Sequence, residues 1–110
     1  RKLKESFGEY DAFANYMRDF KTVDVLLIDD IGAETVTPWS RDEVLGTILQ
    51  YRMDNKLPTF FTSNFTIDEL EVHFANSTNK DDLVKARRIM ERIKYLSVDI
   101  EIISENRRKS

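Results

Sequence analysis

The segment 23–32, with the sequence VDVLLIDDIG, constrains the fold of this chain more than any other part of it. It begins with a nearly unbroken apolar run and continues with two adjacent carboxylates, Asp29 and Asp30, before Gly32. A short, β-branched apolar run is typical of a strand buried on both faces within a parallel sheet. Gly32 favours a turn at its end. Because open α/β sheets bind ligands at the carboxyl ends of their strands, the paired acids predict a functional site there. The alternative interpretation is that the acids only cap the strand or begin a turn.

Composition limits the classes of protein to which this chain can belong. Its 110 residues suffice for one small domain, and its hydrophobic share of 41% is ordinary for a globular protein. A net charge of -3 means that no overall basic field predicts nucleic-acid binding, although basic residues cluster within 80–94 and 107–109. The absence of cysteine excludes disulfides, thiol nucleophiles and cysteine-based zinc sites. No apolar run reaches membrane-spanning length and no signal peptide is visible, so we expect a cytoplasmic protein without a membrane partner.

Apolar residues at helical spacing predict an amphipathic helix over residues 2–20, which leads into the strand. Its aromatic stripe could serve as a stacking platform for bases, but we expect those rings to pack in the core. The chain begins with Arg-Lys-Leu-Lys in what reads as the middle of a helix, so we expect a fragment of a longer protein.

A further helix follows the strand, and its start has two candidate positions. Thr37 can cap a helix that begins at Pro38, because proline suits the first helical turn. Alternatively, Ser40 and Glu43 can form a capping box, with Trp39 in the accompanying hydrophobic staple. We expect Trp39 in the staple rather than as an exposed contact residue.

The remaining elements follow from periodicity and capping signals. The only histidine, His73, has no second histidine or cysteine nearby, so we interpret it as a surface residue and not a metal ligand. In order, the sequence predicts the end of the second helix near Asn55, a strand over 59–62, a helix over 67–74 with Thr66 and Glu69 as a capping box, a helix over 83–95, a strand over 98–102 with one wet face, and a basic tail over 104–110.

Helices connect each predicted strand to the next, which implies a parallel sheet with right-handed crossovers. The strand ends then meet at one edge, where Asp29, Asp30 and Asn64 all lie. Two acids and a neutral amide suit metal-assisted phosphate chemistry, because such chemistry relies on positioning and charge stabilisation.

Three segments resemble the Walker B, sensor 1 and arginine-finger segments of the AAA+ ATPases. The residue sequences of four stretches resemble the DnaC-type helicase loaders of that class. The segments are 23–32, 59–65 and 85–93, and the stretches are 29–34, 49–53, 57–65 and 88–96. The resemblance implies an α/β fold with the three-layer parallel sheet of P-loop NTPases. It also implies that residues 1–110 are the C-terminal portion of an AAA+ domain, with a helix over 1–22 and the part from Walker B to the last strand and tail over 23–110.

The chain departs from the family pattern in one respect that decides activity. It contains no G-x-x-x-x-G-K-[ST] phosphate loop, since its three glycines are Gly8, Gly32 and Gly46. We therefore expect the first strand and the phosphate loop upstream. ATP hydrolysis with Mg²⁺ is then expected of the full-length parent, while this chain alone is expected to be inactive.

The resemblance also implies roles for the residues at the strand ends. Asp29 corresponds to the Walker B acid that holds Mg²⁺ through water, and Asn64 corresponds to sensor 1, which reads the γ-phosphate of ATP. Asp30 stands where many AAA+ proteins have a catalytic glutamate. Its shorter side chain would reach less far toward the attacking water, which is consistent with the modest turnover of a switch.

Arginines complete the implied site. Arg92 best matches the finger that reaches the nucleotide of a neighbouring subunit, which implies self-association or a ring neighbour, and Arg88 is its rival. Arg107 is the candidate for a sensor-2-like contact with the nucleotide, although the helical lid that normally carries such an arginine is absent here.

The function implied by the resemblance is ATP-dependent loading of the hexameric replicative DNA helicase during primosome assembly and replication initiation. Contact with single-stranded DNA would use the basic helix and the basic tail, with Lys85, Arg87 and Lys94 as the residues to neutralise in a test. Alternatives are another ATPase of the same clade (a transposition helper or a replication initiator) and a non-enzymatic α/β interaction module. A receiver-type phospho-signalling domain would need a third aspartate on an intervening strand and a lysine at the end of the last strand, and neither is visible.

Overall fold

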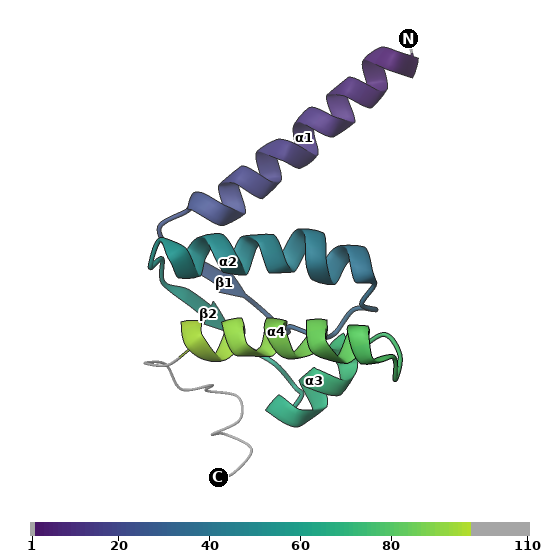
Figure 1. Cartoon of the computed structure of the whole chain (residues 1–110). Helices are drawn as coiled ribbons and strands as arrows, with labels where there is room; N and C mark the ends of the chain where they lie inside the picture. The colour runs from purple at the N-terminus through teal and green to yellow at the C-terminus, as the bar shows by residue number, and fades with distance from the viewer. Residues whose placement is uncertain (1, 98–110) are drawn as a thin grey trace.

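The computed structural model describes the backbone of residues 2–97 and the side chains of residues 11–97. The predicted strand at 98–102, the basic tail and Arg107 lie outside the described residues. In chain order the elements are helix α1 (Lys2–Thr22), strand β1 (Leu26–Ile28), a π-helical stretch η1 (Ser40–Leu45), helix α2 (Gly46–Asp54), strand β2 (Thr59–Phe61), helix α3 (Ile67–Phe74) and helix α4 (Lys80–Leu96) (Figure 1).

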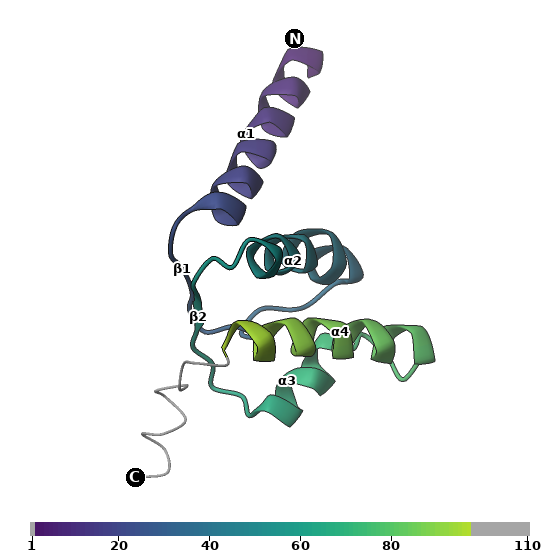
Figure 2. The same ribbon diagram turned by 60° about the vertical axis from the view of Figure 1, so that its left-hand side comes forward.

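Strands β1 and β2 form a parallel pair, in the register Leu26 to Thr59 and Ile28 to Phe61. The prediction of parallel strands joined through helix is therefore confirmed. The prediction of a strand buried on both faces is wrong for the described residues. The side chains of Leu27 and Phe60 are 59% and 39% exposed, and Figure 2 shows α2, α3 and α4 on the same side of the strands. No described element covers the opposite face.

Helix α1 forms as predicted but extends away from the rest of the molecule (Figures 1 and 2). Its aromatic side chains do not pack in the core as expected, since Tyr16 is 63% and Phe20 47% exposed. Phe13 contacts the ring of Trp39, with 5.6 Å between the ring centroids. The amphipathic pattern therefore predicted the helix correctly, but not what its apolar stripe contacts.

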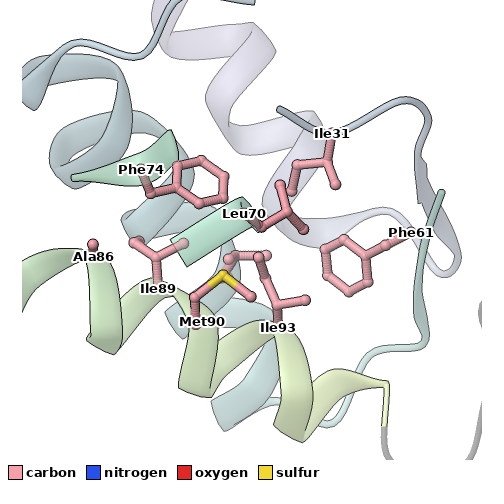
Figure 3. Packing of buried hydrophobic residues seen from close by; sticks show 9 residues of the cluster. Ile31, Phe61, Leu70, Phe74, Ala86, Ile89, Met90 and Ile93 are labelled. Atoms are coloured by element: carbon pink, nitrogen blue, oxygen red, sulfur yellow. The ribbon is translucent and has the colours of Figure 1, made fainter. Parts of the chain in front are cut away.

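The hydrophobic core is built around the inner face of α4 (Figure 3). Leu83, in the first turn of α4, is 47% exposed and lies outside this core. Helix α4 begins three residues earlier than predicted because Asn79 caps it, accepting a hydrogen bond of 2.8 Å from the backbone N–H of Asp81. The buried core residues are Ile31, Leu49, Phe61, Leu70, Phe74, Ala86, Ile89, Met90 and Ile93.

The start of the second helix follows the first of the two candidate patterns. Thr37 Oγ1 accepts a 3.0 Å hydrogen bond from the backbone N–H of Ser40, and the helical backbone begins at Pro38. The alternative capping box of Ser40 with Glu43 is wrong, because Ser40 lies inside the helix and not before it. The ring of Trp39 is 57% exposed and contacts Phe13, so it does not act as a buried staple.

Arg41 is a buried cation that the sequence did not single out. Its side chain is 1% exposed, and its Nε and Nη2 donate to the carboxylate of Asp42 at 2.7 and 2.9 Å. It also donates to the carbonyl of Phe74 at 3.1 Å and to Asp82 at 3.3 Å. The hydrogen bond to the guanidinium holds the pKa of Asp42 below its ordinary value, and the same pairing raises the pKa of Arg41. Arg41 thus ties η1 to the α3–α4 connection.

Arg52 is buried and has no carboxylate partner among the residues that the structure describes. It is fully shielded from solvent, and burial lowers its pKa from the ordinary value. Backbone carbonyls from the end of α1 and the approach to β2 accept most of its hydrogen bonds, which satisfies carbonyls that a helix end leaves open. The acceptors are the carbonyls of Phe20 (3.1 Å), Lys21 (3.1 Å), Val23 (2.7 Å), Asp24 (3.5 Å) and Pro58 (2.8 Å) and the hydroxyl of Thr59 (2.8 Å).

Candidate active site at the carboxyl ends of the strands

The two parallel strands end at the same edge and bring the predicted polar residues together. Asp29 and Asp30 follow β1, while Asn64 follows β2 after two further residues. All three side chains are exposed. Asn64 Nδ2 donates a 3.2 Å hydrogen bond to Asp30 Oδ1. The amide and the second acid of the predicted site are therefore in direct contact.

Thr62, which the sequence pattern did not mark as a site residue, connects the two acids. Its hydroxyl donates to Asp29 Oδ1 and accepts a 2.7 Å hydrogen bond from the backbone N–H of Asp30. Its backbone N–H donates to the carbonyl of Ile28 at 3.1 Å, which continues the strand pairing into the site. The signal in the sequence was the position of Thr62 at the predicted end of the second strand, where it was read only as strand. Only the register of the two strands places it opposite Asp29.

The backbone at Asp30 adopts the left-handed conformation, with φ of 57°. Aspartate is one of the few non-glycine residues that visit this conformation routinely. The turn lets the N–H of Asp30 reach the hydroxyl of Thr62 while its carboxylate meets Asn64. The left-handed turn therefore orients both polar groups of Asp30 toward the end of β2.

Gly32 closes this turn for steric as well as conformational reasons. Its φ is 94°, and a Cβ at this position would lie 2.7 Å from Leu70 Cδ2 and 3.0 Å from Phe65 Cδ2. The turn after the acids is therefore pressed against the start of α3. That start is rigidly built, since Thr66 and Glu69 form the predicted capping box with bonds of 2.8 and 3.2 Å.

A hollow of about 490 Å³ opens beside the acids. The residues that line it are Asp29, Asp30, Ile31, Gly32, Ala33, Glu34, Thr35, Val36, Ser40, Arg41, Leu45 and Phe74.

His73 packs against the connection that follows β1. Its ring stacks on Phe65, and its Nε2 lies 3.0 Å from the carbonyl oxygen of Glu34. This contact ties the connection to α3, so His73 is a partly buried packing residue and not simply a surface one.

The donor set at this edge suits a hard cation. Two exposed carboxylates and a side-chain amide supply oxygen ligands, which Mg²⁺ prefers over nitrogen or sulfur. Among the described residues, no group of three or more histidine, cysteine or acidic side chains could hold a metal by itself. In phosphate chemistry, Mg²⁺ is held by one or two carboxylates together with water and phosphate oxygens.

Arg92 and Arg88 lie elsewhere, in a groove of about 590 Å³ between α2 and α4. Arg92 Nε donates a 2.8 Å hydrogen bond to Gln50 Oε1 on α2. The groove includes none of Asp29, Asp30 and Asn64. The structure thus brings together the predicted acids and the predicted amide but separates the predicted arginine finger from them.

The basic face of α4 is partly neutralised. Lys85 Nζ lies 3.3 Å from Asp81 and 3.9 Å from Asp42. Arg87 forms an ion pair of 3.4 Å with Glu71.

Within the described part of the chain, no helix combines the length and the apolar character needed to cross a bilayer.

Comparisons of sequence and of structure both relate the chain to a helicase loader. No family model matches the chain. The chain is 50% identical over 109 residues to the replicative helicase loader DnaI of Bacillus subtilis (strain 168), a match that covers 98% of this chain. It spans only about a third (35%) of the length of that loader. A crystal structure of DnaI superposes with a TM-score of 0.70 at 50% identity, covering 76% of this chain and 43% of the other.

Proposed function

The chain is a homologue of part of the replicative helicase loader DnaI, and on that premise we propose that it supplies the hydrolysis and sensing half of an ATP-dependent helicase loader. The similarity over 98% of the chain carries this proposal and confirms the resemblance to helicase loaders seen in the sequence. Its process would be primosome assembly at the initiation of DNA replication, in the cytoplasm, with the hexameric replicative helicase as partner.

The fold proposed for the complete domain is the three-layer parallel sheet of the AAA+ P-loop ATPases, of which residues 1–110 form the C-terminal portion. The exposed outer face of β1 and β2 supports this, because Leu27 and Phe60 are apolar and uncovered in the described residues. The proposed phosphate loop and first strand belong to the preceding part of that domain, since no such loop occurs in this sequence.

The chemistry that we propose for this site uses its two exposed acids. Asp29 would hold Mg²⁺ through water, and Thr62 orients the Asp29 carboxylate by donating to one of its oxygens. Bound Mg²⁺ supplies charge neutralisation for the phosphoryl group of ATP. Asp30 orients the attacking water, and Asn64 holds the Asp30 carboxylate while it senses the γ-phosphate. Aspartate is one methylene shorter than the glutamate usual at this position, so slow turnover is expected.

Arg92 is proposed to act on the nucleotide of a neighbouring subunit. Its groove between α2 and α4 contains none of the acids, which fits action in trans and not on the nucleotide of its own subunit. Such an arginine stabilises charge on the transferring phosphoryl group. Self-association, or a heterologous ring neighbour, follows from this role. Arg107 is proposed as a weaker nucleotide contact.

Single-stranded DNA is proposed as a further partner. Lys85 and Arg87 are paired with carboxylates, so their net contribution to a polyanion site is reduced. Lys94 forms no ion pair among the described residues and is the strongest of the three candidates. Neutralising Lys94 should lower the salt dependence of DNA binding more than neutralising Lys85. Binding that is independent of salt would exclude this surface.

The proposed function is tested by titrating a fluorescent ATP analogue with Mg²⁺ into two proteins, this chain and a version extended upstream through the phosphate loop. The expected result is binding by the extended protein alone. ATP turnover by the extended protein should then fall about 1,000-fold in the Arg92→Ala variant, because fingers of this kind contribute about that factor. Tight binding by the 110-residue chain itself would contradict the assignment of the phosphate site.

A further inference from the structure

We propose that Gln50 is a positioning residue for Arg92, which it orients for contact with the anionic phosphate of a neighbouring subunit. This inference rests on the proposed function, because it deepens the role of Arg92 as a finger acting in trans. Gln50 lies on α2 and Arg92 on α4, so the contact between them spans the groove described above.

The first step of the argument is the direction of the Gln50 amide. Gln50 Nε2 donates a 2.9 Å hydrogen bond to Asp54 Oδ1, one turn further along α2. This bond commits the NH₂ group of the amide to Asp54, so the amide oxygen faces α4. Gln50 Oε1 accepts from Arg92 Nε at 2.8 Å. Asp54 and Gln50 therefore form an ordered pair that presents a neutral acceptor to Arg92.

The second step is which part of the guanidinium Gln50 occupies. The contact uses Nε alone, and neither Nη atom of Arg92 has a hydrogen-bond or ion-pair partner among the described residues. Two terminal nitrogens on a planar guanidinium form the fork that binds carboxylate or phosphate bidentately. Gln50 thus restricts the orientation of Arg92 without consuming the atoms that an anion would contact.

The third step is charge. A carboxylate at position 50 would also orient Arg92, but it would neutralise the cation and oppose an incoming phosphate. The neutral amide orients the guanidinium and leaves its full charge available. The buried Arg41 shows the opposite arrangement, since carboxylates of Asp42 and Asp82 occupy its Nε and Nη2. Arg41 therefore has a structural role, whereas the contact between Arg92 and Gln50 leaves the terminal nitrogens of Arg92 available to bind an anion.

The test uses mixed subunits of the full-length protein that carries this chain. Subunits with Asp29→Asn keep the finger but lack a working acid, and subunits with Arg92→Ala keep the acid but lack the finger. Mixing them in equal amounts should restore ATP turnover above the mean of the two alone. Adding Gln50→Leu to the Asp29→Asn subunit should lower the restored kcat about tenfold, because a misplaced group loses its advantage in orientation. The KM for ATP should stay unchanged.

The same substitution placed in the other subunit is the control for a merely structural role. Gln50→Leu in the Arg92→Ala subunit should leave the restored turnover intact, because that subunit has no Arg92 to orient. Met53→Leu in the Asp29→Asn subunit is the matched substitution on the same helix and should also have no effect. Asp54→Ala in that subunit should give a smaller loss than Gln50→Leu, since it only frees the amide to rotate.

The outcomes separate this inference from the proposed function. Restored turnover that is insensitive to Gln50→Leu in the finger-bearing subunit would overturn the role of Gln50 and leave Arg92 in place. Equal losses from both placements would show a structural effect on packing of α2 and α4 and would also overturn it. No restoration in the first mixture would overturn the trans role of Arg92, and the role of Gln50 with it.

Discussion

The two ends of the two-stranded sheet both carry charged side chains, but these are buried at one end and exposed at the other. At the amino end, Arg52 is fully buried, and its hydrogen bonds go to carbonyls at the end of α1, in the connection to β1 and before β2, and to the hydroxyl of Thr59. At the carboxyl end, Asp29 and Asp30 are exposed and are held by the hydroxyl of Thr62. At the amino end, Arg52 shields backbone carbonyls from water, whereas at the carboxyl end the two aspartates expose their charge to solvent.

This difference separates stability from chemistry along the same pair of strands. Polar groups that are buried contribute to stability only when all are satisfied, so losing Arg52 would leave several acceptors unpaired at once. Exposed acids can exchange one partner for water at little cost. We therefore expect substitutions at the amino end to unfold the protein, and substitutions at the carboxyl end to remove activity from a folded protein.

The largest effect is expected at the amino end. Arg52→Met should lower the free energy of unfolding by about 3 kcal/mol or more, because the buried carbonyls that it contacts lose their donor. Urea unfolding followed by circular dichroism measures this. Arg18→Met is the matched control, since Arg18 pairs only loosely with Asp19 at 3.8 Å on the exposed surface of α1. Equal losses in both variants would contradict the sealing role of Arg52.

At the carboxyl end, Asp29→Asn tests whether chemistry is separate from stability. ATP turnover of the full-length protein should fall about 100-fold or more, because the carboxylate proposed to hold Mg²⁺ through water loses its charge. The free energy of unfolding should change by less than about 1 kcal/mol, as is usual for exposed positions. Unchanged turnover would support the alternative of a non-enzymatic interaction module.

Thr62 links the strand pairing to the acids and should give an intermediate effect. Thr62→Val removes the donor to Asp29 and the acceptor for the Asp30 N–H. Turnover should fall about tenfold because the carboxylate proposed to hold Mg²⁺ is less well oriented, as when hydrogen-bond partners of metal ligands are removed. Thr62→Ser keeps the hydroxyl and should retain most activity. The comparison is made on kcat at saturating ATP over a range of Mg²⁺ concentrations, and equal loss in the two variants would exclude a role for the hydroxyl.

The smallest effect is expected from the backbone of Asp30. Asp30→Ala should destabilise the protein by about 1 kcal/mol, because alanine adopts the left-handed conformation at a cost of roughly that size. Asp30→Gly should cost less, since glycine takes up this conformation without steric penalty. Thermal unfolding of the two variants gives the difference. The φ of 57° indicates strain at Asp30. A larger loss of stability in the glycine variant than in the alanine variant would contradict that strain.

Local patterns determined most of the elements. The capping signals at Thr66 and Glu69 and at Thr37 and Pro38 depend on neighbours within a few residues, so the sequence specifies them directly. The clustering of Asp29, Asp30 and Asn64 was predictable as well, because parallel strands must end at a common edge. The likeness to helicase loaders was also visible in the sequence itself.

Tertiary structure alone decided the contacts that join distant elements. The hydroxyl of Thr62 meets Asp29 only through the strand register, and Arg41, Arg52 and Gln50 find partners on elements far away along the chain. Periodicity also could not tell which apolar faces are covered, so the exposed face of β1 and the stripe on α1 were wrongly expected to be buried. The physical reason is the same in each case. Capping and periodicity depend on residues close in sequence, whereas burial and long-range hydrogen bonds depend on which surface another element covers.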